Sequence, residues 1–392
     1  MGGAWRREGG GARSTEQGCR GDRLVAPFSL KAGKLMTCTI DHVRVLLTVV
    51  AIVFSLEAVA HAQGKKPASL AELAAYLGPD REQILLAGAK SEGKVVWYTS
   101  LSGGSYKALA EAFEAKYPGV KVEVYRAGGA ELTLRITEEA KAQRYLADAL
   151  ETTEEPLTAF REAKLLTPFS SPYLRNYPAE AKEKAPGNLV LWTIARESYV
   201  GFAYNKVKVP AAAIPKNFEG LLNPELKGRM IFGTGGTGPE IIGAMLKVKG
   251  EAFVKKLKGQ EIRLFTFGST AIRDQIATGE IEAAPVIFQT HALEAAEKGA
   301  PVEWLPMDIV PVHAGAAILG TRPPHPHAAL LMVDFLLSRD GQAVLERYKY
   351  GSASKDYGFK RWYPQRGLTR EQFERDATKW EKLMNNVVRK GG

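Results

Sequence analysis

The chain has 392 residues, 45% of them hydrophobic, and a formal net charge of +10 at pH 7. Residues 1–35 contribute +4 (seven Lys and Arg against three Asp and Glu) and residues 36–62 contribute −1, so the remainder keeps +7. Its basic residues are scattered among acids without interleaved aromatics, which argues against nucleic-acid binding. Both cysteines, Cys19 and Cys38, precede residue 63, so the rest of the chain has no disulfide, thiolate metal site or cysteine nucleophile.

Residues 36–62 have the pattern of a secretory signal that begins inside the sequence. A weakly basic start precedes an apolar run, and an Ala-x-Ala cleavage site ends at Ala62. The apolar run is shorter than the roughly 20 residues that span a bilayer. We therefore expect translation to start at Met36, residues 1–35 to be absent from the mature protein, and cleavage near Ala62 to release a soluble periplasmic protein.

The remaining residues are too many for one typical domain and suit two. In the first block, short β-rich runs alternate with amphipathic stretches. The expected elements are a helix over 68–91, a strand over 95–99, a helix over 102–117, a strand over 120–125, a helix over 130–143, a strand over 146–152 and a helix over 154–164. Strands separated by crossover helices predict a parallel, doubly wound sheet with helices on both faces.

A second α/β block follows a loop-rich region over 168–186. Its expected elements are a β-rich run over 192–205, a strand over 227–232, helices over 239–249 and 250–258, a strand over 263–267, a helix over 271–278 and a strand over 282–288. Helices over 327–337 and 341–348 and a polar, aromatic tail complete the chain. We find no internal repeat.

Six segments carry a resemblance to a known family. They lie at 93–100, 145–149, 165–169, 201–205, 223–229 and 333–338, the last accompanied by Gln342. In order and spacing they resemble those of bacterial extracellular solute-binding proteins of ABC importers, in particular the ferric-iron-binding type. The resemblance implies an α/β, two-lobed periplasmic-binding-protein fold of type 2. Each lobe would be a doubly wound sheet flanked by helices, and crossing hinge strands would join the lobes around a ligand cleft.

The resemblance also suggests boundaries and partners. Lobe 1 would comprise residues 63–195 and 308–345, and lobe 2 would comprise 196–307 and 346–392 with the C-terminal helices. The crossings would fall near 195–205 and 306–312. The implied function is that of a monomeric, non-catalytic periplasmic receptor without a cofactor, which delivers a small polar or anionic solute to an ABC permease in the inner membrane.

In open α/β sheets, ligands bind beyond the carboxyl ends of the strands, which selects the candidate ligand-binding residues. Glycine-rich helix starts among them favour an anion, although hydroxyls there can simply cap helices and the glycines can form plain turns. The candidates are Ser100, Leu101, Ser102, Gly129, Glu151 and Thr152 in lobe 1, Tyr199 near the first crossing, and Thr234, Gly235, Gly236, Thr237, Ser269, Thr270, Gln289, Thr290 and His291 in lobe 2.

The sequence departs from the ferric-binding pattern that it resembles. Ferric-binding relatives present two adjacent tyrosines after the strand that here ends near Phe288, and a histidine after the first strand. Here the matching positions are Thr290 with His291, and Ser102. Phenolate and carboxylate oxygens suit a hard cation, so a cleft without phenolates favours another ligand. If iron is the ligand after all, Glu151 and His291 are the remaining candidates.

Two further function classes stay open. A secreted two-lobed enzyme is the first, although the chain lacks a Gly-x-Ser-x-Gly elbow and a His-Glu-x-x-His motif. A ligand sensor for a membrane signalling protein is the second. His313, His325 and His327 do not form a metal-binding spacing with His291, and we expect His325 and His327 to lie solvated in a surface turn.

Overall fold

A computed structural model describes residues 67–101, 104–154, 156–233, 237–266 and 268–390. They belong to one compact unit. The expected signal peptide and the preceding residues lie outside this described part. Among the described residues, no helix is both long and apolar enough to cross a membrane.

The first sheet starts from three parallel strands. β1 (Lys94–Thr99) lies between β2 (Lys121–Arg126) and β3 (Ala149–Thr153). The crossover helices α4 (Ser105–Lys116) and α5 (Gly129–Lys141) join β1 to β2 and β2 to β3. Because parallel strands end at the same edge of a sheet, the residues that follow β1, β2 and β3 gather at one edge.

The same sheet continues with antiparallel strands in the order β2-β1-β3-β10-β5-β4. β10 (Val310–Leu319) is antiparallel to both β3 and β5 (Leu189–Asn205), and β4 (Lys182–Ala185) pairs with β5. The α/β fold class is confirmed, and the parallel order expected of the first block holds for β1, β2 and β3; the antiparallel strands that extend this sheet were not predicted. β10 returns to β3 from a distant part of the chain, so no single crossover helix imposes a parallel direction on the pair.

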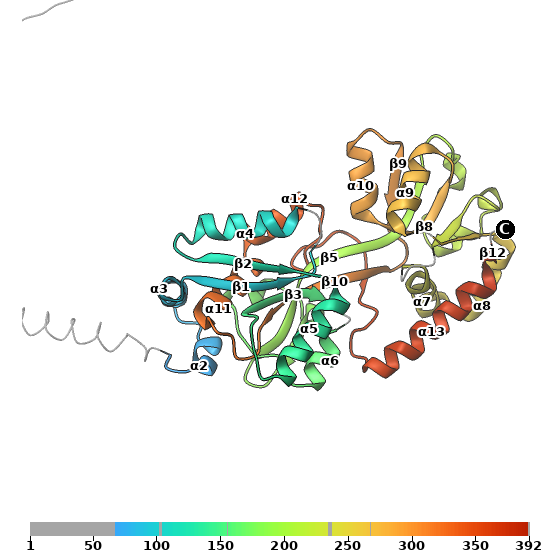
Figure 1. The fold of residues 1–392 in the computed structure, drawn as a ribbon. Coiled ribbons are helices and arrows are strands. Elements are labelled where there is room, and N and C mark those ends of the chain that lie inside the picture. The colour runs from blue at the N-terminus through green and yellow to red at the C-terminus, as the bar shows by residue number, and fades with distance from the viewer. Residues whose placement is uncertain (1–66, 102–103, 155, 234–236, 267, 391–392) are drawn as a thin grey trace, which may run out of the picture. The chain divides into compact units, whose positions relative to one another are not determined.

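β5 extends beyond this sheet and pairs with a second set of strands. From Val200 onward it is antiparallel to β8 (Ala283–Phe288) and β9 (Val302–Leu305). Figure 1 shows this long strand in green, running from the region of β1 and β3 to that of β8 and β9. A separate parallel sheet consists of β12 (Arg389–Lys390), β7 (Arg263–Phe265) and β6 (Ile231–Gly233).

Helices and 3-10 turns account for most of the remaining elements. The other helices are α2 (Leu70–Ala75), α3 (Arg81–Glu92), α6 (Leu157–Glu162), α7 (Thr237–Lys249), α8 (Glu251–Lys256), α9 (Ser269–Thr278), α10 (Gln289–Glu297), α11 (Pro326–Leu337), α12 (Arg339–Arg347) and α13 (Arg370–Val387). Single 3-10 turns lie at Pro172–Asn176, Ala179–Ala181, Ala211–Ala213, Phe218–Leu222, Pro224–Leu226 and Leu257–Gln260. The short strand β11 (Arg361–Trp362) pairs with β10.

Three expected elements differ from the structure. The single helix over 68–91 is two helices, because Gly78 and Pro79 interrupt it between α2 and α3. The strand expected over 227–232 starts only at Ile231, since a 3-10 turn precedes it. The tail contains α13, which begins with a capping box at Thr369 and buries Trp380, Leu383, Met384 and Val387.

Two separate hydrophobic cores hold the fold together. The first core includes β5 residues up to Tyr199 and β10 residues from Val310 onward. The second core includes β5 residues from Val200 onward, buried residues of the following chain up to Ile309, and buried residues of α13. The chain therefore passes from the first core to the second between Tyr199 and Val200, and returns to the first core between Ile309 and Val310. Both points lie close to the two expected crossings. The lobe boundaries themselves stay a prediction.

Candidate functional site

At the edge of the sheet where β1, β2 and β3 end, Glu151 on β3 connects this strand to β1 and β5. Its buried carboxylate accepts hydrogen bonds from Thr99 Oγ1 at 2.8 Å and Ser100 Oγ at 3.4 Å. Arg196 Nε donates to the other carboxylate oxygen at 2.8 Å, and Arg196 Nη2 lies 3.2 Å from Ser100 Oγ. The side chains of Arg196 and Glu151 are only 8% and 2% exposed, so this is a buried ion pair. Its carboxylate is therefore already neutralised from within the protein.

The contact between Glu151 and Arg196 passes over the intervening strand β10. Gly315 pairs with Arg196 on one side of β10 and with Thr153 on the other. A Cβ atom at position 315 would lie 2.4 Å from Glu151 Oε1 and 2.6 Å from Arg196 Nε. A glycine is required here because any side chain would occupy the space in which the two charged groups meet.

The neighbouring candidates lie at the same edge. Leu101 is buried and its N–H donates to Thr99 Oγ1 at 3.1 Å, which shapes the turn after β1. Gly129 begins α5, and a Cβ atom there would lie 3.7 Å from Thr152 Oγ1. Thr152 is fully buried, and its hydroxyl has no hydrogen-bond partner. Ser100, Gly129, Glu151 and Thr152 are thus brought together as the strand order predicts.

A second group lies around the start of α9 and α10. Ser269 Oγ is 3.0 Å from His291 Nδ1 and accepts the N–H of Phe288 at 3.3 Å. The His291 ring also packs edge-on against Phe288. Burial lowers the pKa of His291, so the ring is neutral at pH 7. Of the other candidates, Thr290 and Thr237 are buried, Gln289 is half-buried and Thr270 is exposed.

Tyr199 is not free to reach a ligand. It is buried, and its hydroxyl donates to the carboxylate of Glu197, which also accepts from Arg361 Nη1 at 2.8 Å and from Tyr363. Burial, and then the charge of Glu197, raise the pKa of Tyr199 far above its usual value. This side chain therefore belongs to a hydrogen-bond network at the point where β5 changes core.

Not every candidate can be placed. Ser102, Thr234, Gly235 and Gly236 lie outside the described residues. Within the described part of the chain, no hydrogen bond or ion pair joins the Glu151 group to the His291 group. Sequence reasoning missed Arg196 as the partner of Glu151. The available signal was that Arg196 and its neighbour Glu197 are the two charged residues in the β-rich segment over 192–205.

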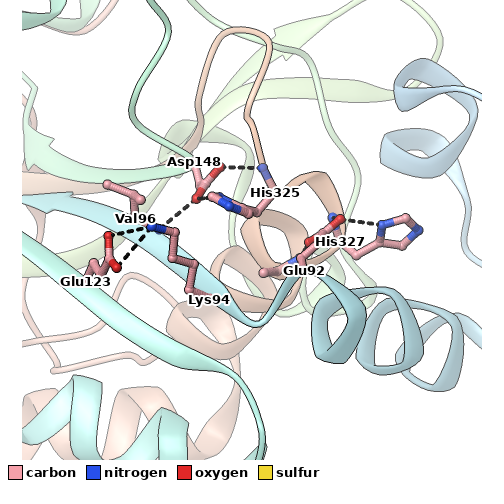
Figure 2. Close-up of polar contacts among 8 residues, drawn as sticks. Glu92, Lys94, Val96, Glu123, Asp148, His325 and His327 are labelled. Carbon is pink, nitrogen blue, oxygen red and sulfur yellow. Dashed lines mark hydrogen bonds and ion pairs between the residues drawn. The ribbon is translucent and has the colours of Figure 1, made fainter.

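The remaining histidines form separate carboxylate pairs. His325 Nδ1 lies 2.8 Å from Asp148, and His327 Nδ1 lies 2.7 Å from Glu92, as Figure 2 shows. Both histidines are half-buried, so the expectation of solvated side chains in a surface turn is wrong. His313 pairs with Glu240. Among the described residues, no three His, Cys, Asp or Glu side chains lie close enough to hold a metal ion.

The family is clear from comparison with known proteins. A family model described as "Bacterial extracellular solute-binding protein" matches residues 102–351, and the chain belongs to this family. Its members bind solutes outside the cytoplasm and work with a membrane permease. As a member of this family, the chain is a solute-binding protein that acts outside the cytoplasm.

Solved structures share the fold. Iron-bound HitA from Pseudomonas aeruginosa is 25% identical, with a TM-score of 0.57 over 75% of this chain and 99% of that chain. A substrate-binding protein of an ABC transporter from Agrobacterium tumefaciens is 16% identical, with a TM-score of 0.59 over 76% and 96%. AfuA from Actinobacillus pleuropneumoniae, with fructose-6-phosphate bound, is 22% identical, with a TM-score of 0.53 over 75% and 97%. No curated protein matches the chain.

Proposed function

We propose that the chain is a non-catalytic, monomeric receptor that binds a small organic anion or zwitterion between its two lobes and delivers it to an inner-membrane permease. Cleavage near Ala62 would release it into the periplasm. The choice of ligand rests on one observation: both residues that remain as candidate iron ligands already have partners within the protein. The carboxylate of Glu151 is paired with Arg196 at 2.8 Å, and the Nδ1 atom of His291 is held by Ser269 at 3.0 Å.

Ferric iron would need the Glu151 carboxylate to leave Arg196, whereas His291 would still offer its Nε2 atom while Ser269 holds Nδ1. Removing Glu151 from Arg196 would leave a buried guanidinium without its counter-ion, at a cost of about 3–5 kcal/mol. No tyrosine stands at the start of α10, where Gln289, Thr290 and His291 follow β8. The helix starts at the ends of the strands instead supply N–H donors, which suit an anion. The phosphorylated sugar in AfuA is an anion of this kind in a protein of the same fold.

Iron remains the second candidate, because iron-bound HitA shares the fold. A thermal-shift screen of the mature protein separates the two. The panel contains phosphorylated sugars, sulfonates, phosphonates, amino acids, polyamines, thiamine and ferric citrate. We expect an organic anion or zwitterion at 100 times its Kd to stabilise the protein by about 2.7 kcal/mol. A visible charge-transfer band with ferric citrate, lost in Glu151→Ala and in His291→Ala, would reverse the ranking.

A further inference from the structure

We propose that the ion pair between Lys349 and Glu297 is a latch that holds the two hydrophobic cores in their present arrangement without help from a ligand. The proposal goes beyond the proposed function, because it concerns the equilibrium between arrangements of the protein alone. Neither residue is among the candidate ligand-binding residues. The latch would therefore act on the hinge and not directly on the solute.

The ion pair joins elements that belong to different cores. α12 packs into the first core through Leu345, and Lys349 lies two residues beyond the end of this helix. α10 packs into the second core through Ala295, and Glu297 is its last residue. The Nζ atom of Lys349 pairs with the carboxylate of Glu297. A relative movement of the two cores must therefore stretch or break this contact.

Lys349 occupies a backbone position that usually belongs to glycine. Its φ angle is +63°, in the left-handed region. The N–H of Lys349 donates to the carbonyl of Glu346 at 2.9 Å, and the N–H of Tyr350 donates to the carbonyl of Leu345 at 3.1 Å. These two bonds form a Schellman motif, in which glycine is preferred because it has no Cβ atom. The lysine side chain therefore brings a backbone cost that glycine would avoid.

Glu297 also lies where helix physics disfavours it. It is the last residue of α10, next to the negative end of the helix dipole, where a carboxylate is repelled. Pairing with the ammonium group of Lys349 offsets this repulsion. Each residue is thus locally unfavourable for its own helix, and the contact between the cores is the gain that the two residues share.

The exposure of the pair sets its strength. The side chains of Lys349 and Glu297 are 29% and 59% exposed, so water and salt screen their attraction. An ion pair of this kind shifts an equilibrium by about two- to fivefold. That is enough to bias the hinge toward one arrangement, and weak enough for a ligand with different affinities for the arrangements to override it.

Pulsed electron resonance on the mature protein without ligand tests the latch. The mature protein has no cysteine of its own, so spin labels can be attached at Lys90→Cys on α3 and Lys256→Cys on α8, both exposed. These helices contribute to the first and the second core, respectively. In Lys349→Gly and in Glu297→Gln, we expect the population at distances outside the wild-type peak to rise about two- to fivefold.

Lys164→Gly is the matched control. Lys164 has a φ angle of +56° after α6, and its N–H and that of Leu165 donate to Arg161 and Phe160 at 3.1 and 2.8 Å, in the same Schellman pattern. It is exposed and forms no ion pair within the described part of the chain. Glycine suits both positions, so both variants should fold as well as the wild type. The control should keep the wild-type distance distribution.

Salt and charge exchange give signatures that a helix cap alone would not. At about 1 M NaCl the screening length falls to about 3 Å, so the wild-type distribution should broaden toward that of Lys349→Gly, whereas the variant should not respond. The single change Glu297→Lys should broaden the distribution. Combining it with Lys349→Glu restores opposite charges and should restore the wild-type distribution.

Three outcomes would overturn the latch. They are a wild-type distribution in Lys349→Gly that circular dichroism shows to be folded, equal broadening in Lys164→Gly, and failure of the charge exchange to recover the distribution. Each is measured without a solute, so the proposed function would stand. Conversely, a solute screen that favoured iron would overturn the proposed choice of ligand and leave these distances unaffected.

Discussion

Glu154 is a buried carboxyl group whose desolvation outweighs the favourable charge of Arg366. It follows β3, is buried, and has its pKa raised to about 7, chiefly by burial. The unfolded chain would release this proton near pH 4.5, so between about pH 4.5 and 7 the folded protein binds more protons than the unfolded chain. The contribution of Glu154 to stability must therefore fall as pH rises through this window.

The variant Glu154→Gln isolates that contribution. A shift of roughly 2.5 pH units corresponds to about 3 kcal/mol, so we expect the variant to gain that much stability relative to the wild type between pH 4 and pH 8. Urea unfolding at a series of pH values measures the difference. The matched control is Glu162→Gln, an exposed glutamate on α6, which should follow the wild type at every pH. A constant difference between Glu154→Gln and wild type would contradict the assignment.

Sequence reasoning reached some residues of the candidate site and not others, for a physical reason. Ser100 and Glu151 meet because β1 and β3 are parallel and Thr99 pairs with Glu151, which follows from a β-α-β-α-β order. Arg196 reaches Glu151 across β10, and β10 comes from a segment more than 100 residues further along the chain. No local pattern encodes that pairing, and the requirement for glycine at position 315 appears only once the three strands are adjacent.

At the scale of elements, the first turn of α11 is capped by a carboxylate from another helix. Glu92, at the end of α3, accepts the N–H groups of His327 at 3.1 Å and Ala328 at 2.8 Å in the first turn of α11. His327 Nδ1 adds a third contact at 2.7 Å, as Figure 2 shows. Burial alone would raise the pKa of Glu92, but the hydrogen bonds from His327 and Ala328 outweigh it and hold the pKa below its usual value.

Removal of this cap should destabilise the protein in a pH-dependent way. We expect Glu92→Ala to cost about 1–2 kcal/mol at pH 7, as for a lost N-cap. Because the pKa of Glu92 is depressed in the folded protein, its contribution is present above about pH 4.5 and disappears as pH falls through the folded value. The difference in urea unfolding should shrink accordingly. Gln83→Ala, an exposed change on the same helix, should stay within about 0.5 kcal/mol, and an equal loss in both variants would refute the capping role.

The types of most elements and the parallel direction of β1 to β3 were predictable, whereas the antiparallel pairing of β10 was not. Apolar β-rich runs and helical periodicity locate β1 to β3 and α4 to α5 within a few residues. The tail that contains α13 is mainly charged, and its apolar residues become informative only because they face α7 and the second core. Antiparallel pairing of β10 with β3 and β5 arises from tertiary packing.

At the scale of the whole molecule, residues 351–363 are bonded to both β5 and β10, the two strands that pass between the hydrophobic cores. The backbone of Gly351 exchanges hydrogen bonds of 2.8 and 2.9 Å with Glu197 on β5. β11 pairs with β10 at Val310 and Pro311. The ion pair of Arg361 with the buried carboxylate of Glu197 joins the two attachments. This segment therefore braces β5 and β10 where each changes core, and any hinge motion between lobes must deform it.

Arg361→Gln should consequently widen the range of lobe arrangements. The change leaves Glu197 buried without its cation, which weakens the brace without altering a candidate ligand-binding residue. Because the chain after residue 62 has no cysteine, spin labels can be attached at Lys107→Cys on α4 and Lys255→Cys on α8, both exposed. Pulsed electron resonance on the ligand-free protein should show a broader distance distribution in Arg361→Gln. Glu374→Gln breaks an exposed pair with Arg370 on α13 and should leave the distribution unchanged. A folded Arg361→Gln protein, verified by circular dichroism, with the wild-type distribution would show that the segment does not restrain the hinge.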